Sequence, residues 1–291
     1  MSTLTPPRTG DLLRIADLEA DELHWLLDRA AAMKADHRGW LDAMPGASVA
    51  CFFAKPSTRT RVSFEAAINR LGALPIMLRP DELQLGRGEP IADTARVLAS
   101  YCAAIVIRTF EQSDIEQMSE FSSVPVINAL SDEHHPCQAL ADLLTIREHF
   151  DDLGGVRVAY IGADNNVARS LAEAGALADM EVVVCSPPDG DPVAAVQGAQ
   201  VVYTDVWVSM GEDARRDKLV RRLEPYRVTP ELMAAADPQA IFMHCLPAHR
   251  GEEVMPEVID GPQSLVFAQA ANRLPTEQAV LYALTSGRWE A

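Results

Sequence analysis

Short apolar runs alternate along the chain with stretches in which apolar residues recur every three or four positions. The runs that predict buried strands are 49–53, 75–78, 104–107, 124–127, 156–161, 181–185, 201–203, 240–244 and 264–267. The helical pattern occupies 20–34, a segment ending at 71, 91–101, 114–121, 136–150, 166–178, 193–197 and 276–284. Buried strands that alternate with helices are typical of a parallel sheet covered on both faces. The pattern therefore predicts an α/β protein.

A turn rich in Asp and Gly at 151–155 separates the pattern into two series. The chain has 291 residues, of which 48% are hydrophobic, and this is enough for two cores. We expect two doubly wound parallel-sheet domains, 1–150 and 151–291, with the active site in the cleft between them. The last predicted helix, 276–284, is expected to pack back on the first domain.

Chemically capable polar residues follow the carboxyl ends of the predicted strands. In the first half they are 55–61, Arg108 and 134–138, and in the second half they are 164–166, Asp205, 209–211 and 244–247. Ligands of open α/β sheets bind outside the carboxyl ends of the strands. We therefore expect two half-sites, one contributed by each domain.

The segment Ser57–Arg61 lies between the buried run at 49–53 and the helical pattern at 64–68. This placement combines hydroxyl groups, guanidinium groups and the N–H groups of a helix start, which together suit a phosphate. An ordinary Ser or Thr helix cap followed by solvated arginines is the alternative interpretation. These five residues alone do not decide between the two.

The composition limits the partners of such an anion site. The formal charge of −17 and the sequence pI near 4.8 come without a basic stripe, which argues against nucleic acid as a partner. The five cysteines are odd in number and widely spaced, which favours a reducing compartment, and we expect the cytoplasm. The N-terminal residues lack a signal pattern and no apolar run is long enough for a membrane span, so we expect no membrane association.

Metal and dinucleotide sites are the competing interpretations of the strand-end residues. Two groups could be taken for metal ligands: His134, His135 and Cys137, and His244, Cys245 and His249. We expect no metal, because neighbours on a strand point to opposite faces and no Cys-x-x-Cys pair accompanies them. The turn at 162–166 lacks the further glycines of a dinucleotide loop, so NAD is not expected. Cys245 taken alone is more typical of a buried small side chain than of a reactive thiol.

Four ordered motifs point to a known family. They are Ser57–Arg61, His135–Gln138, Asp205–Gly211 and His244–Pro247. Together they resemble the aspartate/ornithine transcarbamylase superfamily, and the last two resemble its ornithine carbamoyltransferases. The resemblance runs from about the first helix to Arg273. It implies an enzyme that uses carbamoyl phosphate and L-ornithine to make L-citrulline and phosphate, works without a metal or other cofactor, and assembles as a homotrimer.

The resemblance also implies roles for individual residues. It implies a catalytic set of Arg108, His135, Asp205 and Cys245. The residues that it assigns to carbamoyl phosphate are Ser57, Thr58, Arg59, Thr60, Arg108, His135, Gln138, Cys245, Leu246 and Arg273. Those that it assigns to ornithine are Asn166, Asp205, Ser209 and Met210. Gly211, beside Ser209, suggests a loop that moves when substrate binds.

Some positions depart from the pattern of the family. Pro56, Ala163–Asp164 and Ala271 stand where other residues are usual, and the segment between Cys185 and Val201 is short. These departures leave open a related amine as substrate, such as putrescine, lysine or a modified ornithine. A non-catalytic protein that binds carbamoyl phosphate or another anion is a second alternative. The sequence leaves open whether the enzyme would serve arginine biosynthesis or breakdown.

Overall fold

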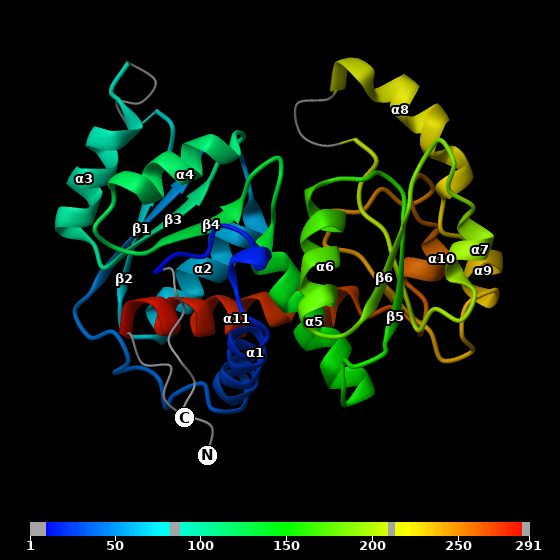
Figure 1. Ribbon diagram of the computed structural model, residues 1–291, viewed down its shortest axis with the longest axis horizontal. Helices are drawn as coiled ribbons and strands as arrows, with labels where there is room; N and C mark the ends of the chain where they lie inside the picture. Colours follow the sequence, from blue (N-terminus) through cyan, green and yellow to red (C-terminus); the bar gives the residue numbers. More distant parts are fainter. Residues whose placement is uncertain (1–9, 82–87, 209–212, 287–291) are drawn as a thin grey trace. The chain divides into compact units, whose positions relative to one another are not determined.

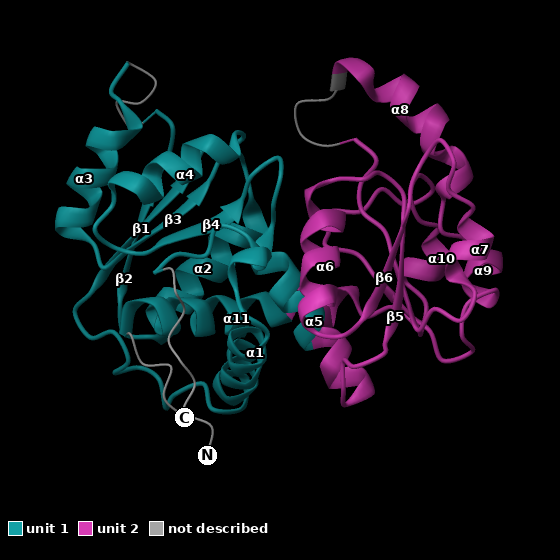
Figure 2. Ribbon diagram, in the orientation of Figure 1, with its two compact units in different colours: residues 1–144, 272–291 teal, residues 145–271 magenta. Residues whose placement is uncertain are grey.

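The structure is a computed structural model, and it describes residues 10–81, 88–208 and 213–286. Its chain forms two compact units, Met1–Leu144 with Asn272–Ala291 and Thr145–Ala271 (Figure 2). Both boundaries fall inside helices, namely α5 (Pro136–Phe150) and α11 (Val266–Ser286). The chain thus leaves unit 1 within a helix, before the turn at 151–155 that the sequence pattern indicated. None of the described helices combines the length and apolar character needed to cross a membrane.

Unit 1 contains a sheet of four parallel strands in the order β2-β1-β3-β4. The strands are β1 (Ser48–Phe53), β2 (Leu74–Leu78), β3 (Ala104–Arg108) and β4 (Val126–Leu130). All five residues of β3 are buried, as expected of a central strand covered on both faces. The strand order reverses between β1 and β3, and this is where ligands of such sheets bind.

Helices cover both faces of this sheet (Figure 1). They are α1 (Ala20–Ala35), α2 (Thr58–Arg70), α3 (Ile91–Tyr101), α4 (Gln112–Phe121) and the segments of α5 and α11 that belong to unit 1. On one face, Ala95 of α3 and Met118 of α4 pack with Ile105 and Ile107 of β3. Figure 1 shows α2 and α11 on the opposite face. The buried residues of α2, Phe64 and Ile68 among them, recur at helical spacing.

Unit 2 repeats this architecture with a second parallel sheet in the order β6-β5-β7-β8. Its strands are β5 (Arg157–Ile161), β6 (Glu181–Cys185), β7 (Val201–Tyr203) and β8 (Ile241–Met243). Its helices are α6 (Asn166–Leu177), α7 (Pro192–Val196), α8 (Arg216–Leu223), α9 (Pro230–Ala234) and α10 (Pro256–Ile259). The strand order here reverses between β5 and β7. The predicted α/β class with two parallel sheets is confirmed.

The end of the chain differs from the sequence prediction. The strand expected at 264–267 is wrong: Ser264 forms a single bridge to Phe242, and α11 begins at Val266. The helix expected at 276–284 is only the second part of α11, which continues through Pro275. Proline removes an N–H group and usually ends a helix, so the local sequence predicts a helix that begins only after Pro275.

Candidate active site

Helix α2 begins directly after β1, at the point where the strand order of unit 1 reverses. Ser57 is its cap, and the hydroxyl of Ser57 accepts a hydrogen bond from the Thr60 N–H at 3.3 Å. The cap interpretation is therefore correct for Ser57. It does not compete with anion binding, because a capped helix start still carries partial positive charge. Thr58 is exposed and Arg59 is half-buried in the first turn.

The Thr60 hydroxyl is the meeting point of three predicted residues. It accepts hydrogen bonds from Arg108 Nη1 at 3.4 Å and from Arg273 Nη2 at 2.8 Å. Arg108 ends β3 and Arg273 lies on α11, and all three side chains are buried. A hydroxyl oxygen that accepts from two donors keeps its own hydrogen for a ligand. The cluster thus offers two guanidinium groups and one hydroxyl donor.

His135 lies next to this cluster, directly before the start of α5 at Pro136. Burial lowers its pKa well below the usual value, and the positive charges of Arg273, Arg108 and Arg59 lower it further. The imidazole is therefore neutral at neutral pH. A neutral imidazole can still donate one N–H to a carbonyl oxygen, so His135 adds a donor without adding a charge to be desolvated.

Gln138 and Asp142 lie one turn apart on α5, and both are buried. Gln138 Nε2 donates to Asp142 Oδ1 at 2.8 Å. Because a carboxylate only accepts hydrogen bonds, this contact fixes which end of the amide faces Asp142. Gln138 Oε1 is then left as a buried acceptor with no hydrogen-bond partner among the described residues. Such an acceptor suits the NH₂ group of a small planar ligand.

Sequence analysis missed one residue of this site, Glu277. Its carboxylate is fully buried, lies 3.4 Å from Arg273 Nη2 and accepts a hydrogen bond from Ser63 Oγ at 2.8 Å. Burial raises the pKa of Glu277 to about 7, although Arg273 and Ser63 act in the opposite direction. The available signal was the spacing of Arg273 and Glu277, which places them on one helix face. Because the helix was expected to begin after Pro275, Arg273 and Glu277 were not expected to share a helix.

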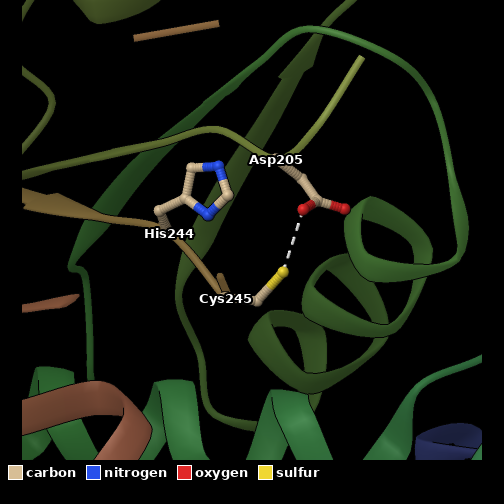
Figure 3. Close-up of side chains that lie close together, drawn as sticks. All are labelled: Asp205, His244 and Cys245. Atoms are coloured by element: carbon tan, nitrogen blue, oxygen red, sulfur yellow. Dashed lines mark hydrogen bonds between the residues drawn. The ribbon is translucent and has the colours of Figure 1, made fainter. Parts of the chain in front are cut away.

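The predicted residues Asp205 and Cys245 come together in unit 2, after the ends of β7 and β8. Figure 3 shows the Cys245 thiol directed at the Asp205 carboxylate, and Cys245 Sγ donates to Asp205 Oδ1 at 2.9 Å. Asn165 Nδ2 donates to the other oxygen, Asp205 Oδ2, at 3.0 Å. Both carboxylate oxygens are thus held. A carboxylate beside a thiol can attract an ammonium group and hold the amine that remains after the ammonium group loses a proton.

Asn165 is a second residue that sequence analysis missed. Its Oδ1 accepts from the N–H groups of Val167 and Ala168, each at 3.0 Å, so it caps α6. The neighbouring Asn166, which was predicted to bind ornithine, is the first residue of α6 and is half-buried. An Asn pair before a helical run is a common cap signal, and it could have indicated Asn165.

The segment after β8 holds Cys245 in place through its neighbours. His244 N–H donates to Gln269 Oε1 at 2.9 Å, and Leu246 N–H donates to His244 Nδ1 at 2.8 Å. Leu246 has a φ of 57°, which non-glycine residues seldom adopt. The hydrogen bond from the Leu246 N–H to the buried His244 stabilises this conformation, and strained backbone of this kind is common at functional sites.

The reason given against a metal at this segment does not hold. The ligand atoms of Asp205, His244 and Cys245 lie within 4.8 Å of one another. The strand β8 ends at Met243, so the alternation of a strand does not separate His244 from Cys245. Cys245 Sγ donates to Asp205 and His244 Nδ1 accepts from Leu246, while His244 Nε2 lies 3.3 Å from Glu253 Oε1. This donor set therefore favours a hydrogen-bonded network.

Two predicted residues cannot be placed. Ser209 and Met210, together with the loop at Gly211, lie outside the described residues. The short segment between Cys185 and Val201 contains one brief helix, α7. The remaining predicted residues form two groups, one in unit 1 around Thr60 and one in unit 2 around Asp205.

Comparison with known families matches both units. Residues 10–148 match "Aspartate/ornithine carbamoyltransferase, carbamoyl-P binding domain". Residues 189–284 match "Aspartate/ornithine carbamoyltransferase, Asp/Orn binding domain". The first match contains Ser57, Thr60, Arg108 and His135, and the second contains Asp205 and Cys245.

Individual relatives agree over nearly the whole chain. An ornithine carbamoyltransferase of Symbiobacterium thermophilum is 46% identical, with 96% of this chain and 98% of that protein covered. The solved structure of ornithine carbamoyltransferase from Pyrococcus furiosus has a TM-score of 0.91 at 43% identity, covering 98% of this chain and all of that one. The enzyme of the same name from Thermus thermophilus has a TM-score of 0.89 at 38% identity, covering 97% and 100%. The chain therefore belongs to the aspartate/ornithine carbamoyltransferase family of enzymes.

Proposed function

We propose that the protein transfers the carbamoyl group of carbamoyl phosphate to the side-chain amine of L-ornithine, giving L-citrulline and phosphate. The observation that carries this proposal is the Thr60 hydroxyl, which accepts from both Arg108 and Arg273 beside the neutral His135. Such a set of fixed donors suits an oxyanion that forms during acyl transfer. The Asp205–Cys245 pair in unit 2 supplies a place for the amine.

The unit 1 group is proposed to bind carbamoyl phosphate and to stabilise the charge that develops on it. The phosphate binds at the start of α2 through Ser57, Thr58, Arg59 and Thr60, with Arg108 and Arg273. The carbonyl oxygen accepts from Thr60, Arg108 and His135, and the carbamoyl NH₂ donates to Gln138 Oε1. Fixed donors to a developing oxyanion contribute about 2.7–4 kcal/mol each to lowering a barrier.

The unit 2 group is proposed to bind ornithine and prepare its amine. A free alkyl amine has a pKa near 10.4, so it must lose a proton before it can attack. Asp205 attracts the ammonium group, and Cys245 contacts the reacting nitrogen. Asn166, Ser209 and Met210 are assigned to the amino-acid head group by family resemblance, and Leu246 to the reacting groups. The amine nitrogen forms a bond to the carbonyl carbon, the C–O bond to phosphate breaks, and the proton lost from the nitrogen leaves with the phosphate.

Assembly and location extend the proposal. The family resemblance supports a homotrimer. The five cysteines form no disulfide and four of them are buried, which supports a reducing compartment such as the cytoplasm. The matched domains support binding of carbamoyl phosphate within 1–150 and of ornithine within 151–291, with a part in arginine metabolism.

The test is a product assay at saturating carbamoyl phosphate with ornithine, putrescine and lysine compared. We expect citrulline from ornithine, with a kcat/KM at least about 100-fold above that for putrescine, because putrescine leaves the polar groups for the amino-acid head unpaired. Equal rates with putrescine would overturn the assignment of the head group. Binding of carbamoyl phosphate without transfer to any amine would instead support a non-catalytic binding protein.

A further inference from the structure

We propose that Glu277 is a positioning residue for the binding of carbamoyl phosphate. Glu277 holds Arg273 against Thr60 and takes up a proton when the phosphate binds. The inference rests on the proposed function, because it concerns the same pocket. It adds a residue that neither the sequence motifs nor the family match assigns.

Glu277 contacts residues on both helices that line the proposed phosphate pocket, α11 and α2. The same nitrogen of Arg273, Nη2, lies 2.8 Å from Thr60 Oγ1 and 3.4 Å from Glu277 Oε1. The same carboxylate oxygen accepts from Ser63 Oγ at 2.8 Å, and Ser63 Oγ also lies 3.3 Å from the carbonyl oxygen of Thr60. Glu277 thus ties the guanidinium group of α11 to the first turn of α2. Movement of this carboxylate would displace Arg273 from Thr60.

Groups from four elements face Glu277. Arg273 faces it from α11 itself, Ser63 from α2, Cys51 from β1 and Cys137 from α5. Burial raises the pKa of both thiols, and the charge of Glu277 raises it further, so the thiols stay neutral. Arg273 is therefore the charged group that balances Glu277 at this place.

Because of this balance of charges, a bound anion should change the protonation of Glu277. Because burial raises its pKa to about 7, Glu277 is partly ionised at neutral pH. A phosphate dianion at Arg273 and Thr60 brings a like charge close to the buried carboxylate, and like charges favour protonation. Binding should then take up protons at Glu277. By linkage, the affinity for carbamoyl phosphate should fall as the pH rises through 7.

The experiment measures binding of carbamoyl phosphate to the full-length protein by calorimetry at pH 6.5, 7.5 and 8.5. Each titration is repeated in buffers of different ionisation enthalpy, which reports proton uptake. Wild-type protein should take up part of a proton at pH 7.5 and lose about 5- to 10-fold in affinity between pH 6.5 and 8.5. Glu277→Gln, which keeps the size and an acceptor oxygen, should show neither effect. Glu120→Gln, an exposed charge change on α4, should behave as wild type.

A second variant keeps the inference testable if Glu277→Gln does not fold. Ser63→Ala removes a hydrogen bond that lowers the pKa of Glu277, so the pKa of Glu277 should rise in this variant. The fall in affinity for carbamoyl phosphate should then occur at a higher pH than in wild type. Unchanged proton uptake in Glu277→Gln, or an unmoved profile in Ser63→Ala, would overturn the role of Glu277. A wild-type protein that does not bind carbamoyl phosphate would contradict the proposed function itself.

Discussion

The residues of unit 1 build their anion site from shared hydrogen bonds. Thr60 accepts from Arg108 and Arg273, and Arg273 is held in turn by Glu277. Because each side chain is buried and held by another, little rearrangement is needed when a ligand binds. Preorganised donors of this kind stabilise developing charge better than mobile ones. Loss of one of the donors to the ligand should therefore change the kinetics.

The substitution Arg59→Ala should weaken the binding of carbamoyl phosphate. The guanidinium group lies in the first turn of α2, and a charge-assisted hydrogen bond to phosphate contributes about 1.5–3 kcal/mol. We expect the KM for carbamoyl phosphate to rise about 10- to 100-fold, with a smaller change for ornithine. Steady-state kinetics with each substrate varied in turn measure both values.

Arg61→Ala is the matched control, because Arg61 is exposed two positions further along α2. It should keep the wild-type KM values. An Arg59→Ala enzyme with unchanged kinetics would show that the phosphate is bound elsewhere.

Cys245→Ala should mainly impair the use of ornithine. The change removes the thiol that donates to Asp205 Oδ1, so the carboxylate loses one of its two fixed contacts. Loss of such a contact costs about 1–3 kcal/mol, and we expect kcat/KM for ornithine to fall about 5- to 100-fold. Cys185→Ala, at the buried end of β6, serves as control. Equal losses in the two variants would contradict a specific role of Cys245.

The residues that could be predicted are those that occur in motifs after strands. Ser57–Arg61 and His244–Pro247 combine several unusual residues in a row, so they stand out without a structure. Glu277 and Asn165 act through partners that are distant in sequence, namely Ser63 and Asp205. A single acid inside a helix, like a single amide at a helix start, is common in any protein. Only the fold shows that these two contact the site.

At the scale of elements, the start of α6 links helix stability to the position of Asp205. Asn165 caps the helix with its oxygen and donates to Asp205 with its nitrogen. Asn165→Asp keeps the capping oxygen but places a carboxylate against Asp205. We expect the stability to change by less than about 1 kcal/mol, whereas kcat/KM for ornithine falls at least about tenfold through like-charge repulsion.

Chemical denaturation and ornithine kinetics measure these two effects separately. Asp191→Ala is the matched control, because Asp191 caps α7 through the same kind of contact, to Val193 and Ala194. It should lose stability by about 1 kcal/mol and keep its ornithine kinetics. An Asn165→Asp enzyme with wild-type ornithine kinetics would show that Asn165 does not position Asp205.

Helix α11 shows where sequence patterns fail at this scale. Pro275 lies inside the helix, and the Thr276 hydroxyl donates to the carbonyl oxygens of Asn272 and Arg273 beside it. Residues on both sides of Pro275 are buried, so tertiary packing maintains a helix that local preference would end. Thr229 before Pro230 was a readable start signal for α9, which sequence analysis did not use.

At the scale of the whole molecule, Glu277 should make stability depend on pH. Burial raises the pKa of its carboxyl group to about 7 in the folded state, well above the ordinary value for glutamate. A carboxyl group with a raised pKa stabilises the fold most below its unfolded value, and this contribution is lost as the pH rises through about 7. At pH 8 we expect Glu277→Gln to be more stable than wild type by about 1–3 kcal/mol.

Urea denaturation at pH 5, 6.5 and 8 measures this difference. The gap between the variant and wild type should narrow toward pH 5, where the wild-type carboxyl group is protonated as well. A gap that stays constant with pH would show that Glu277 does not titrate in this range.

The two-sheet architecture could be predicted because continuous apolar runs are specific for buried parallel strands. The runs at 104–107 and 181–185 coincide with β3 and β6 within one residue. The short helices α8 and α10 were not predicted, because four to eight residues give too little periodicity. Division of the chain within α5 also depends on contacts that no local pattern reports.

We propose that the residues around Thr60 and those around Asp205 serve one reaction. The most direct measurement follows ¹⁴C-labelled carbamoyl phosphate with ornithine as acceptor. We expect label in citrulline, with one phosphate released per citrulline, and strongly reduced transfer in both Arg59→Ala and Cys245→Ala. Phosphate release without labelled citrulline, or full transfer by either variant, would contradict it.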